Sequence, residues 1–280
     1  MSDATPPRVV SLLPSATELL CAVGGADLLV GRSHECDFPD DITHLPVLTA
    51  ARTTAQDSAA IDTEVRAALA DADAPDRSLY HLDEARLREL RPDVILTQSL
   101  CDVCSIDLRT VERVAATMSP VPRVVNLNPT TIEAVFDDVL TVGDAVGRGP
   151  AAREALVALR EGYWSARDYV NAYIEGPEVL FLEWMDPPFV GGHWIPQFIE
   201  AAGGKQSYVE AGAKSVQVDP ETIVAAQPER VIICPCGYGL AEIERDLPAL
   251  EAQRWWRALP AVQSGEVMLV DGNQMFSRPG

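Results

Sequence analysis

Short apolar runs alternate with amphipathic stretches along this chain, a pattern typical of strands that alternate with helices. In the first part of the chain, apolar runs rich in β-branched residues predict strands over residues 8–13, 28–33, 78–82, 94–98 and 123–128. Helical spacing predicts a helix from the capping-box pair Ser15 and Glu18 to Gly24, and further helices over residues 63–70, 83–90 and 107–118. Together these elements indicate one α/β lobe.

A long helical stretch follows this lobe. A second capping-box pair, Thr130 and Glu133, predicts a helix that runs to about Val146. Beyond a break at residues 147–150, apolar residues at helical spacing predict an uninterrupted helix over residues 151–174, which would be about 35 Å long at ~1.5 Å per residue. A helix of this length between two lobes suggests a stiff connection rather than a flexible hinge.

The last part of the chain repeats the α/β plan without a residue-level internal repeat. Strands are predicted over residues 178–184, 230–234 and 266–271, helices over residues 193–202, 220–226, 240–250 and 253–259, and an irregular loop over residues 185–192. We therefore expect two Rossmann-like α/β lobes, over residues 1–147 and 176–280, joined by a single long backbone helix over residues 148–175.

Composition narrows the classes of partner. The chain has 280 residues with 47% hydrophobic content, which is enough for two modest cores. It carries 42 acidic against 22 basic residues, a formal net charge of −20, which argues against nucleic acid and anionic membrane surfaces as partners. Only Lys205 and Lys214 are lysines. Such an acidic, lysine-poor protein is typical of a halophilic cytosol, and an arginine-biased genome is the alternative explanation.

The chain shows no targeting or spanning segment. Its first residues contain no basic region followed by an apolar one, and no apolar run reaches the ~20 residues needed to cross a bilayer. We therefore expect a cytoplasmic protein without membrane insertion. A mature exported form that starts at a new methionine would look similar.

Cysteine, histidine and tryptophan residues gather at the ends of predicted strands. Residues 34–37 and 101–104 each follow a strand directly, Trp184 ends a strand of the second lobe, His193 and Trp194 come shortly after it, and residues 234–236 end another strand. Because open α/β sheets bind ligands at the carboxyl ends of their strands, these residues are expected to line one cleft between the lobes.

Five of the six cysteines lie at these strand ends, which in a cytosolic protein suggests metal or redox chemistry before structural disulfides. Cys101 and Cys104 form a Cys-x-x-Cys pair that can share one metal or close a redox-active disulfide, and incidental packing is the alternative. Tetrahedral zinc or an iron–sulfur cluster requires four thiolates. The best set is Cys36, Cys101, Cys104 and Cys236, with Cys234 packed into its strand and Cys21 buried in the first helix.

The two histidines at strand ends each have two interpretations. His34, next to Glu35, is either a ligand-binding residue or a loop histidine with satisfied hydrogen bonds. His193 and Trp194 either form a flat wall of the cleft, which we favour, or pack the lobe against the long helix. The sequence contains no nucleophile elbow, Walker loop or dinucleotide-binding glycine motif, so a binding protein is expected before an enzyme.

Several segments resemble the periplasmic-binding superfamily for iron siderophores and cobalamin. They are VSLLPSATE at residues 10–18, LRPDVIL at 90–96 and AQPERVI at 226–232, and the likeness covers nearly the whole chain. The cobalamin-binding branch is the most similar, in particular a signal-less, cysteine-containing subgroup. The resemblance implies a helical-backbone substrate-binding protein fold whose lobes hold a ligand between them. It implies ligand contacts from Ser15, Glu35, Trp184 and Trp194.

These observations lead to three hypotheses. The first is a non-enzymatic small-ligand-binding protein that holds cobalamin, another corrinoid or a metal complex between its lobes, with an ABC transporter permease as its partner. In this hypothesis His34 and His193 join the residues implied by the resemblance. The second is a cytosolic metalloprotein whose thiolates bind zinc or an iron–sulfur cluster and serve a redox or enzymatic role. The third is a Cys101–Cys104 redox switch.

Overall fold

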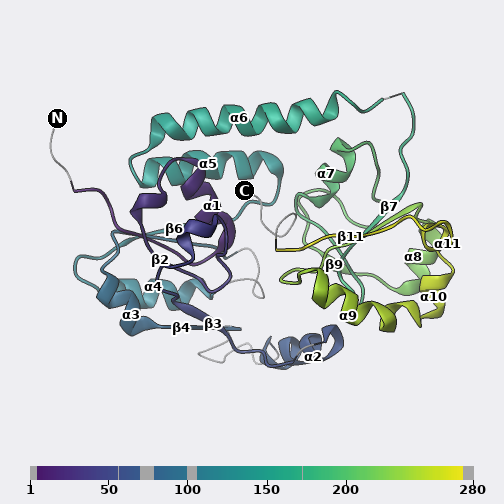
Figure 1. Cartoon of the computed structure of the whole chain (residues 1–280), viewed down its shortest axis with the longest axis horizontal. Helices are drawn as coiled ribbons and strands as arrows, with labels where there is room; N and C mark the ends of the chain where they lie inside the picture. Colours follow the sequence, from purple (N-terminus) through teal and green to yellow (C-terminus); the bar gives the residue numbers. More distant parts are fainter. Residues whose placement is uncertain (1–4, 56, 70–78, 100–105, 172, 274–280) are drawn as a thin grey trace.

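The computed structural model describes residues 5–55, 57–69, 79–99, 106–171 and 173–273. Two α/β lobes lie side by side, and the long helix α6 (Gly149–Arg167) runs from the first toward the second (Figure 1). The mixed α/β fold with two lobes and a backbone helix, predicted from the pattern of apolar residues, is therefore confirmed. The boundaries assigned to the three parts stay a prediction.

The first lobe is built on a four-stranded sheet in the order β2-β1-β5-β6, in which every neighbouring pair is parallel. Every residue of β1 and β5 is buried, as expected of central parallel strands covered by helices. The strands are β1 (Val9–Ser11), β2 (Leu29–Arg32), β5 (Val94–Thr97) and β6 (Arg123–Asn126). The intervening helices are α1 (Pro14–Ala22), α3 (Glu84–Leu90) and α4 (Leu108–Ala116), with short 3₁₀ helices η1 (Ala26–Leu28) and η2 (Asp40–Ile42).

Two short strands and one helix of this lobe stand apart from its main sheet. Strands β3 (Thr49–Ala51) and β4 (Tyr80–Leu82) form an antiparallel pair, and helix α2 (Ser58–Leu69) lies between them in the sequence. In Figure 1, α2 lies at the lower edge of the molecule, beneath the second lobe's α9 (Leu240–Glu251). The sequence pattern missed β3, because a three-residue strand with one buried position carries no periodic signal.

The second lobe contains a five-stranded sheet in the order β11-β10-β7-β8-β9. Its first three strands are parallel, and β8 and β9 extend the edge antiparallel. The strands are β7 (Val179–Trp184), β8 (Phe189–Val190), β9 (Val216–Gln217), β10 (Arg230–Ile233) and β11 (Val267–Leu269). The remaining helices are α7 (Ile195–Ala201), α8 (Pro220–Ala226), α10 (Arg254–Arg257) and α11 (Pro260–Ser264). Strand β8 lies within the stretch expected to be an irregular loop.

The backbone helix is shorter than its sequence predicts. Helix α6 ends at Arg167 instead of residue 174, and beyond it Tyr169 and Tyr173 are 93% and 99% exposed. Because a helix in a protein is held mainly by packing of its apolar face, the helical pattern is not sufficient where most of its large side chains stay exposed. Upstream, α6 packs closely on α5 (Ile132–Ala145): a Cβ added at Gly143 would lie 2.3 Å from the Cβ of Ala152.

Two predicted capping boxes are wrong in detail. Helix α1 begins at Pro14, so Ser15 is inside the helix and provides no cap. Proline is favoured at the first helical position because its missing N–H would lack a partner there. Helix α5 is capped by Thr131, one residue after the predicted Thr130, and the Thr131 hydroxyl accepts the N–H of Ala134. The helix starts expected at residues 83 and 107 are confirmed, and the side chains of Asp83 and Asp107 cap α3 and α4.

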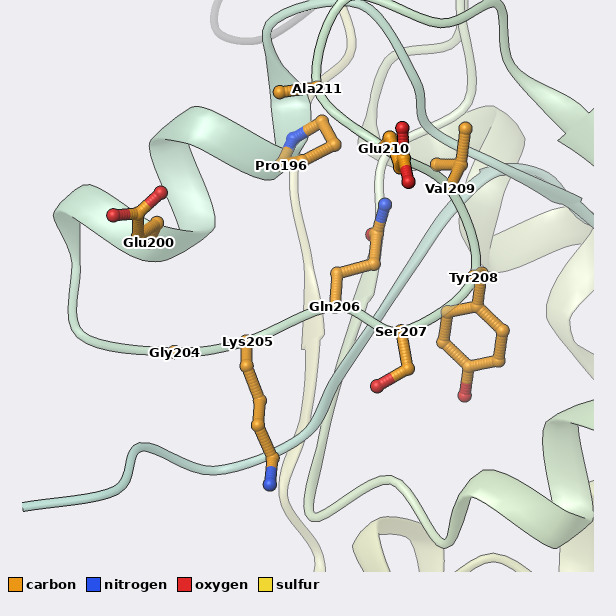
Figure 2. A pocket seen from close by; sticks show the side chains of 10 residues that line it. All are labelled: Pro196, Glu200, Gly204, Lys205, Gln206, Ser207, Tyr208, Val209, Glu210 and Ala211. Atoms are coloured by element: carbon orange, nitrogen blue, oxygen red, sulfur yellow. The ribbon is translucent and has the colours of Figure 1, made fainter.

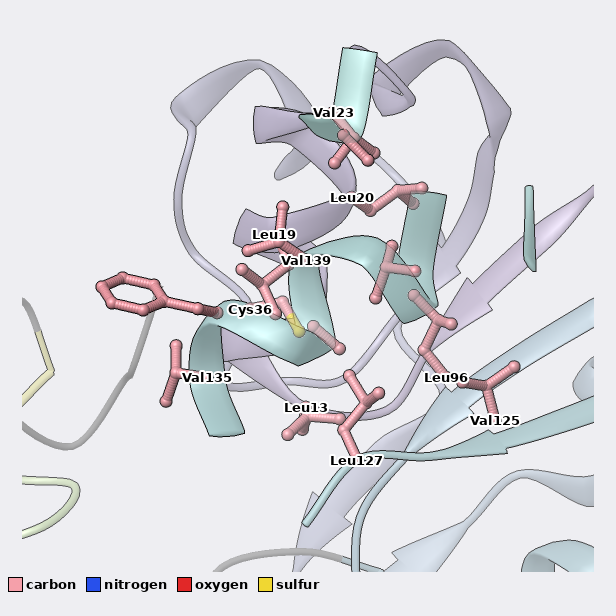
Figure 3. Packing of buried hydrophobic residues seen from close by; sticks show 14 of the residues in the cluster. Leu13, Leu19, Leu20, Val23, Cys36, Leu96, Val125, Leu127, Val135 and Val139 are labelled. Carbon is pink, nitrogen blue, oxygen red and sulfur yellow. The ribbon is translucent and has the colours of Figure 1, made fainter. Parts of the chain in front are cut away.

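A hydrophobic cluster runs through the first lobe and continues into the second. Figure 3 shows its centre, where Leu19 and Leu20 of α1 meet Val139 of α5, with Leu96 of β5 beside them. Phe181 of β7 and Ile195 of α7 belong to the same cluster. Each lobe also has a cluster of its own. The lobes are therefore joined by shared apolar packing, which does not depend on the single connection through α6.

Candidate ligand site at the strand ends

In the first lobe, the residues that follow β2 form a hydrogen-bonded group with the β3–β4 pair. The His34 backbone N–H donates to the hydroxyl oxygen of Thr49 at 3.0 Å, and His34 Nδ1 lies 2.7 Å from the same oxygen. Tyr80 donates its hydroxyl to Glu35 Oε1 at 3.0 Å, and its ring lies 5.4 Å from the imidazole of His34. The β3–β4 pair thus fixes both predicted ligand residues, His34 and Glu35.

His34 is a neutral imidazole with one nitrogen left for a ligand. Burial, together with the positive charge of Arg32, lowers the pKa of His34 below its ordinary value. Its Nε2 atom lies 3.9 Å from Glu35 Oε1, beyond hydrogen-bond distance, and its side chain is 29% exposed. When Nδ1 carries the proton and donates to Thr49, Nε2 presents a lone pair, which is the form in which histidine binds metal ions.

Ser15 and Cys36 lie deeper in the first lobe. Ser15 is buried in the first turn of α1. Cys36 is fully buried in the cluster of Figure 3, and its sulfur lies 3.0 Å from the hydroxyl of Thr17. Burial raises the pKa of Cys36, and hydrogen bonds from Thr17 and Ser33 oppose that rise. Metals bind the thiolate form of cysteine, and a buried thiol with a raised pKa is rarely in that form.

The predicted metal set is divided between the lobes. Cys36 follows β2, whereas Cys236 follows β10 in the second lobe. Cys101 and Cys104 lie outside the described residues. Within the described ranges, no three His, Cys, Asp or Glu side chains are grouped so that they could hold a metal ion. The four-cysteine site, with either zinc or an iron–sulfur cluster, therefore stays a prediction.

In the second lobe, Trp184 ends β7 and contacts Tyr238, a residue that the sequence did not single out. Its indole ring lies edge-on to Tyr238 at 5.1 Å. The Tyr238 hydroxyl donates to Asp246 Oδ2 at 3.1 Å, and Arg245 donates to Asp246 Oδ1 at 2.8 Å. Burial would raise the pKa of Asp246, but these bonds, with one from the backbone of Ser58, hold it below its ordinary value. Asp246 is therefore a buried carboxylate that is fully hydrogen-bonded.

The start of α2 lies against this group, although α2 belongs to the first lobe. The Ser58 N–H donates to Asp246 Oδ2 at 2.9 Å, and the Trp184 indole N–H donates to the Ser58 carbonyl at 3.2 Å. Ile61 packs against the apolar cluster of the second lobe, and Arg66 donates to Gln217 at 2.9 Å. Helix α2 is thus attached to the strand ends of the opposite lobe.

His193 and Trp194 occupy the turn between β8 and α7. His193 has a positive φ of 52°, and its backbone N–H donates to the Ala213 carbonyl at 2.6 Å. Burial and the positive charge of Lys214 lower its pKa, and its Nε2 is buried without a hydrogen-bond partner among the described residues. Trp194 is only 7% exposed and belongs to the shared apolar cluster, which corresponds to the packing alternative. A ligand role for either residue stays a prediction.

The carboxyl ends of the parallel strands in both sheets therefore carry imidazole, indole and acidic groups. The family model described as "Periplasmic binding protein" matches residues 9–273. The chain belongs to this family. No curated protein matches it.

Solved structures of other periplasmic binding proteins share the fold. The periplasmic heme-binding protein RhuT from Roseiflexus sp. RS-1 has a TM-score of 0.72 at 21% identity, over 98% of this chain and 93% of its own. The vitamin B12-binding protein BtuF of Vibrio cholerae has a TM-score of 0.65 at 16% identity, over 96% and 89%. An ABC transporter substrate-binding protein from Listeria monocytogenes EGD-e has a TM-score of 0.70 at 17% identity, over 97% and 92%. These likenesses show that the fold is shared. None of the helices in the described part of this chain is long and apolar enough to cross a membrane.

A surface pocket of this periplasmic binding protein lies away from the strand ends. It has a volume of about 570 Å³ and is formed by residues 204–211 against α7. Figure 2 shows Gln206 pointing toward Pro196 and Glu210, while Lys205 and Tyr208 point to the other side of the loop. The backbone of Lys205 forms an isolated β-bridge with Glu178, which lies just before the amino end of β7. This is the end opposite to Trp184. None of the residues that line this pocket is among the ligand or metal residues predicted from the sequence.

Sequence reasoning missed Tyr238, Asp246 and Thr49. Tyr238 follows the cysteines at the end of β10, so the strand-end rule that selected Cys236 could have found it. Thr49 and Asp246 carried no such signal. Asp246 lies inside a helix in a chain with 42 acidic residues, and only its burial distinguishes it.

Proposed function

We propose that this periplasmic binding protein binds a corrinoid such as cobalamin between its lobes, at the carboxyl ends of the two parallel sheets. His34 is the observation that carries the proposal. A neutral imidazole whose Nδ1 is held by Thr49 is suited to coordinate cobalt through Nε2. Trp184, which is only partly buried at the end of β7 and is held edge-on by Tyr238, supplies an apolar face that suits a flat macrocycle.

The relatives support this class of ligand. Structures with the same fold are described as binding vitamin B12 or heme, and both are metal-centred tetrapyrroles. A metal-coordinating histidine would serve either, so hemin is the natural competitor in the test. The partner that we propose is the permease of an ABC transporter, as expected for a substrate-binding protein of this type.

Titration with hydroxocobalamin tests the proposal. We expect the protein to co-elute with hydroxocobalamin on gel filtration and to shift its visible bands as imidazole replaces the cobalt-bound water. His34→Ala should abolish the band shift and weaken binding by about tenfold or more, because one coordinate bond is lost. His44→Ala, at an exposed histidine of the same lobe, is the matched control.

Three results would contradict the proposal. No co-elution and no band shift with the unaltered protein would remove the corrinoid. A protein that binds hemin but not hydroxocobalamin would be assigned a porphyrin ligand instead. Equal losses in His34→Ala and His44→Ala would show that His34 does not coordinate the metal.

A further inference from the structure

Helix α2 of the first lobe is bound to the second lobe. It belongs to the first lobe by sequence, yet its hydrogen bonds reach three elements of the second lobe: Trp184 at the end of β7, Asp246 in α9 and Gln217 in β9. Its side chain Ile61 packs against the second lobe's apolar cluster. These contacts place α2 over the strand ends that carry the proposed ligand residue Trp184.

The attachment at the start of α2 is electrostatically favourable. The first N–H groups of a helix have no intrahelical acceptor, and the helix dipole places positive potential there. Asp246, buried and ionised, accepts the N–H of Ser58 at 2.9 Å. A carboxylate that accepts hydrogen bonds at a helix start makes one of the stronger single contacts available to such a small interface.

We propose that α2 is a releasable strap that closes the ligand site over Trp184 and must leave Asp246 for a ligand to enter or depart. The closing role rests on the proposed function, whereas the docking of α2 does not. Release is inexpensive for the rest of the fold, because the lobes stay joined by the apolar cluster that includes Phe181 and Ile195. The remaining links of α2 are few, and Arg66, which binds Gln217, has a side chain that is 57% exposed.

Hydrogen exchange tests the docking without any ligand. Once released, a helix of 12 residues is marginal in water, so its amides should exchange faster. Asp246→Asn keeps the shape but removes the charge that holds Ser58, and we expect the peptide spanning residues 58–69 to exchange about fivefold to tenfold faster. Glu244→Gln, at an exposed residue of the same α9, is the control and should leave exchange unchanged. Trp184→Phe, which removes the indole N–H that donates to Ser58 together with part of the ring, should accelerate exchange in the same peptide.

Ligand kinetics test the closing role. In stopped flow with hydroxocobalamin, and separately with hemin, Asp246→Asn should raise the association and dissociation rate constants by a similar factor, about fivefold, with little change in Kd. A strap that gates passage changes both rates, whereas a residue that binds the ligand changes mainly the dissociation rate.

Each outcome decides a separate part. Unchanged exchange in both Asp246→Asn and Trp184→Phe overturns the strap, whether or not a ligand binds. Faster exchange with unchanged rates for a bound probe overturns its closing role. If neither probe binds the unaltered protein, the proposed corrinoid function fails, and the exchange result still decides whether α2 is a releasable strap.

Discussion

Asp138 of α5 should make this protein less stable as the pH rises from about 4 to about 7. Its Oδ2 atom is buried without a hydrogen-bond partner among the described residues. Burial, and secondarily the negative charge of Asp137, raises the pKa of Asp138 to about 7. The perturbation that isolates this effect is Asp138→Asn, which keeps the size of the side chain and removes its ionisation.

The sign and size follow from proton linkage. Below about pH 4 the carboxyl is protonated in both states and costs nothing. Between pH 4 and 7 the unfolded chain loses the proton while the folded chain keeps it, so stability falls, and above pH 7 the cost is constant. A rise from 3.8 to about 7 corresponds to about 4 kcal/mol at ~1.4 kcal/mol per pH unit. Because Asp138 is only partly buried, solvent screening reduces this to about 2 kcal/mol.

Urea denaturation from pH 4 to pH 8 measures the effect. We expect Asp138→Asn to be more stable than the unaltered protein by about 2 kcal/mol at pH 8, and the difference to shrink toward zero near pH 4. The control is Asp144→Asn, at an exposed residue of the same helix, whose effect should stay within about 0.5 kcal/mol at every pH. A difference that is independent of pH, or an Asp138→Asn protein that is less stable at pH 8, would refute this account of the buried carboxyl.

Three further predictions concern the fold, all measured by urea denaturation. Gly192→Ala should lower the free energy of unfolding by about 1–3 kcal/mol, because the added Cβ would lie 2.4 Å from the backbone carbonyl oxygen of Ala213. Gly162→Ala, with open space around it, should raise the free energy of unfolding by about 0.5 kcal/mol. Equal effects of the two substitutions would contradict the close approach at Gly192. Thr131→Ala should lower the free energy of unfolding by about 1 kcal/mol, because the cap of α5 is lost, whereas Thr130→Ala should change it little. The reverse order would support Thr130 as the cap, as expected from the sequence. Phe181→Ala should cost about 3–5 kcal/mol since Phe181 is 2% exposed, and a loss below 1 kcal/mol would contradict its place in the shared cluster.

The outcome of the sequence analysis differed between local and distant features. Strands such as β5 and β10 were found because a buried parallel strand is an uninterrupted apolar run of few residues. The helix starts at residues 83 and 107 were found because a start signal such as an N-capping Asp depends on residues within one helical turn. The cap at Ser15 failed because Pro14, one residue earlier, decided where the helix begins.

Packing explains the two places where helical pattern and structure disagree. The pattern continued to residue 174, but α6 ends at Arg167, and beyond it Tyr169, Tyr173 and Ile174 are exposed. Conversely α2 begins at Ser58, before the predicted start at residue 63, where its first turn lies against Asp246. The limits of both helices therefore depend on how much packing other elements provide, which periodicity does not record.

By itself, the sequence determined the two α/β lobes, the backbone helix, the superfamily, and the placement of His34 and Trp184 at strand ends, because each depends on residues close together in the chain. Only the tertiary structure decided that Trp194 is buried and that Asp246 holds α2. Ser58 and Asp246 are 188 residues apart, and neither differs in type from many others in this acidic chain. Their contact exists because the shared core sets the two lobes side by side, and burial then requires each polar group to find a partner.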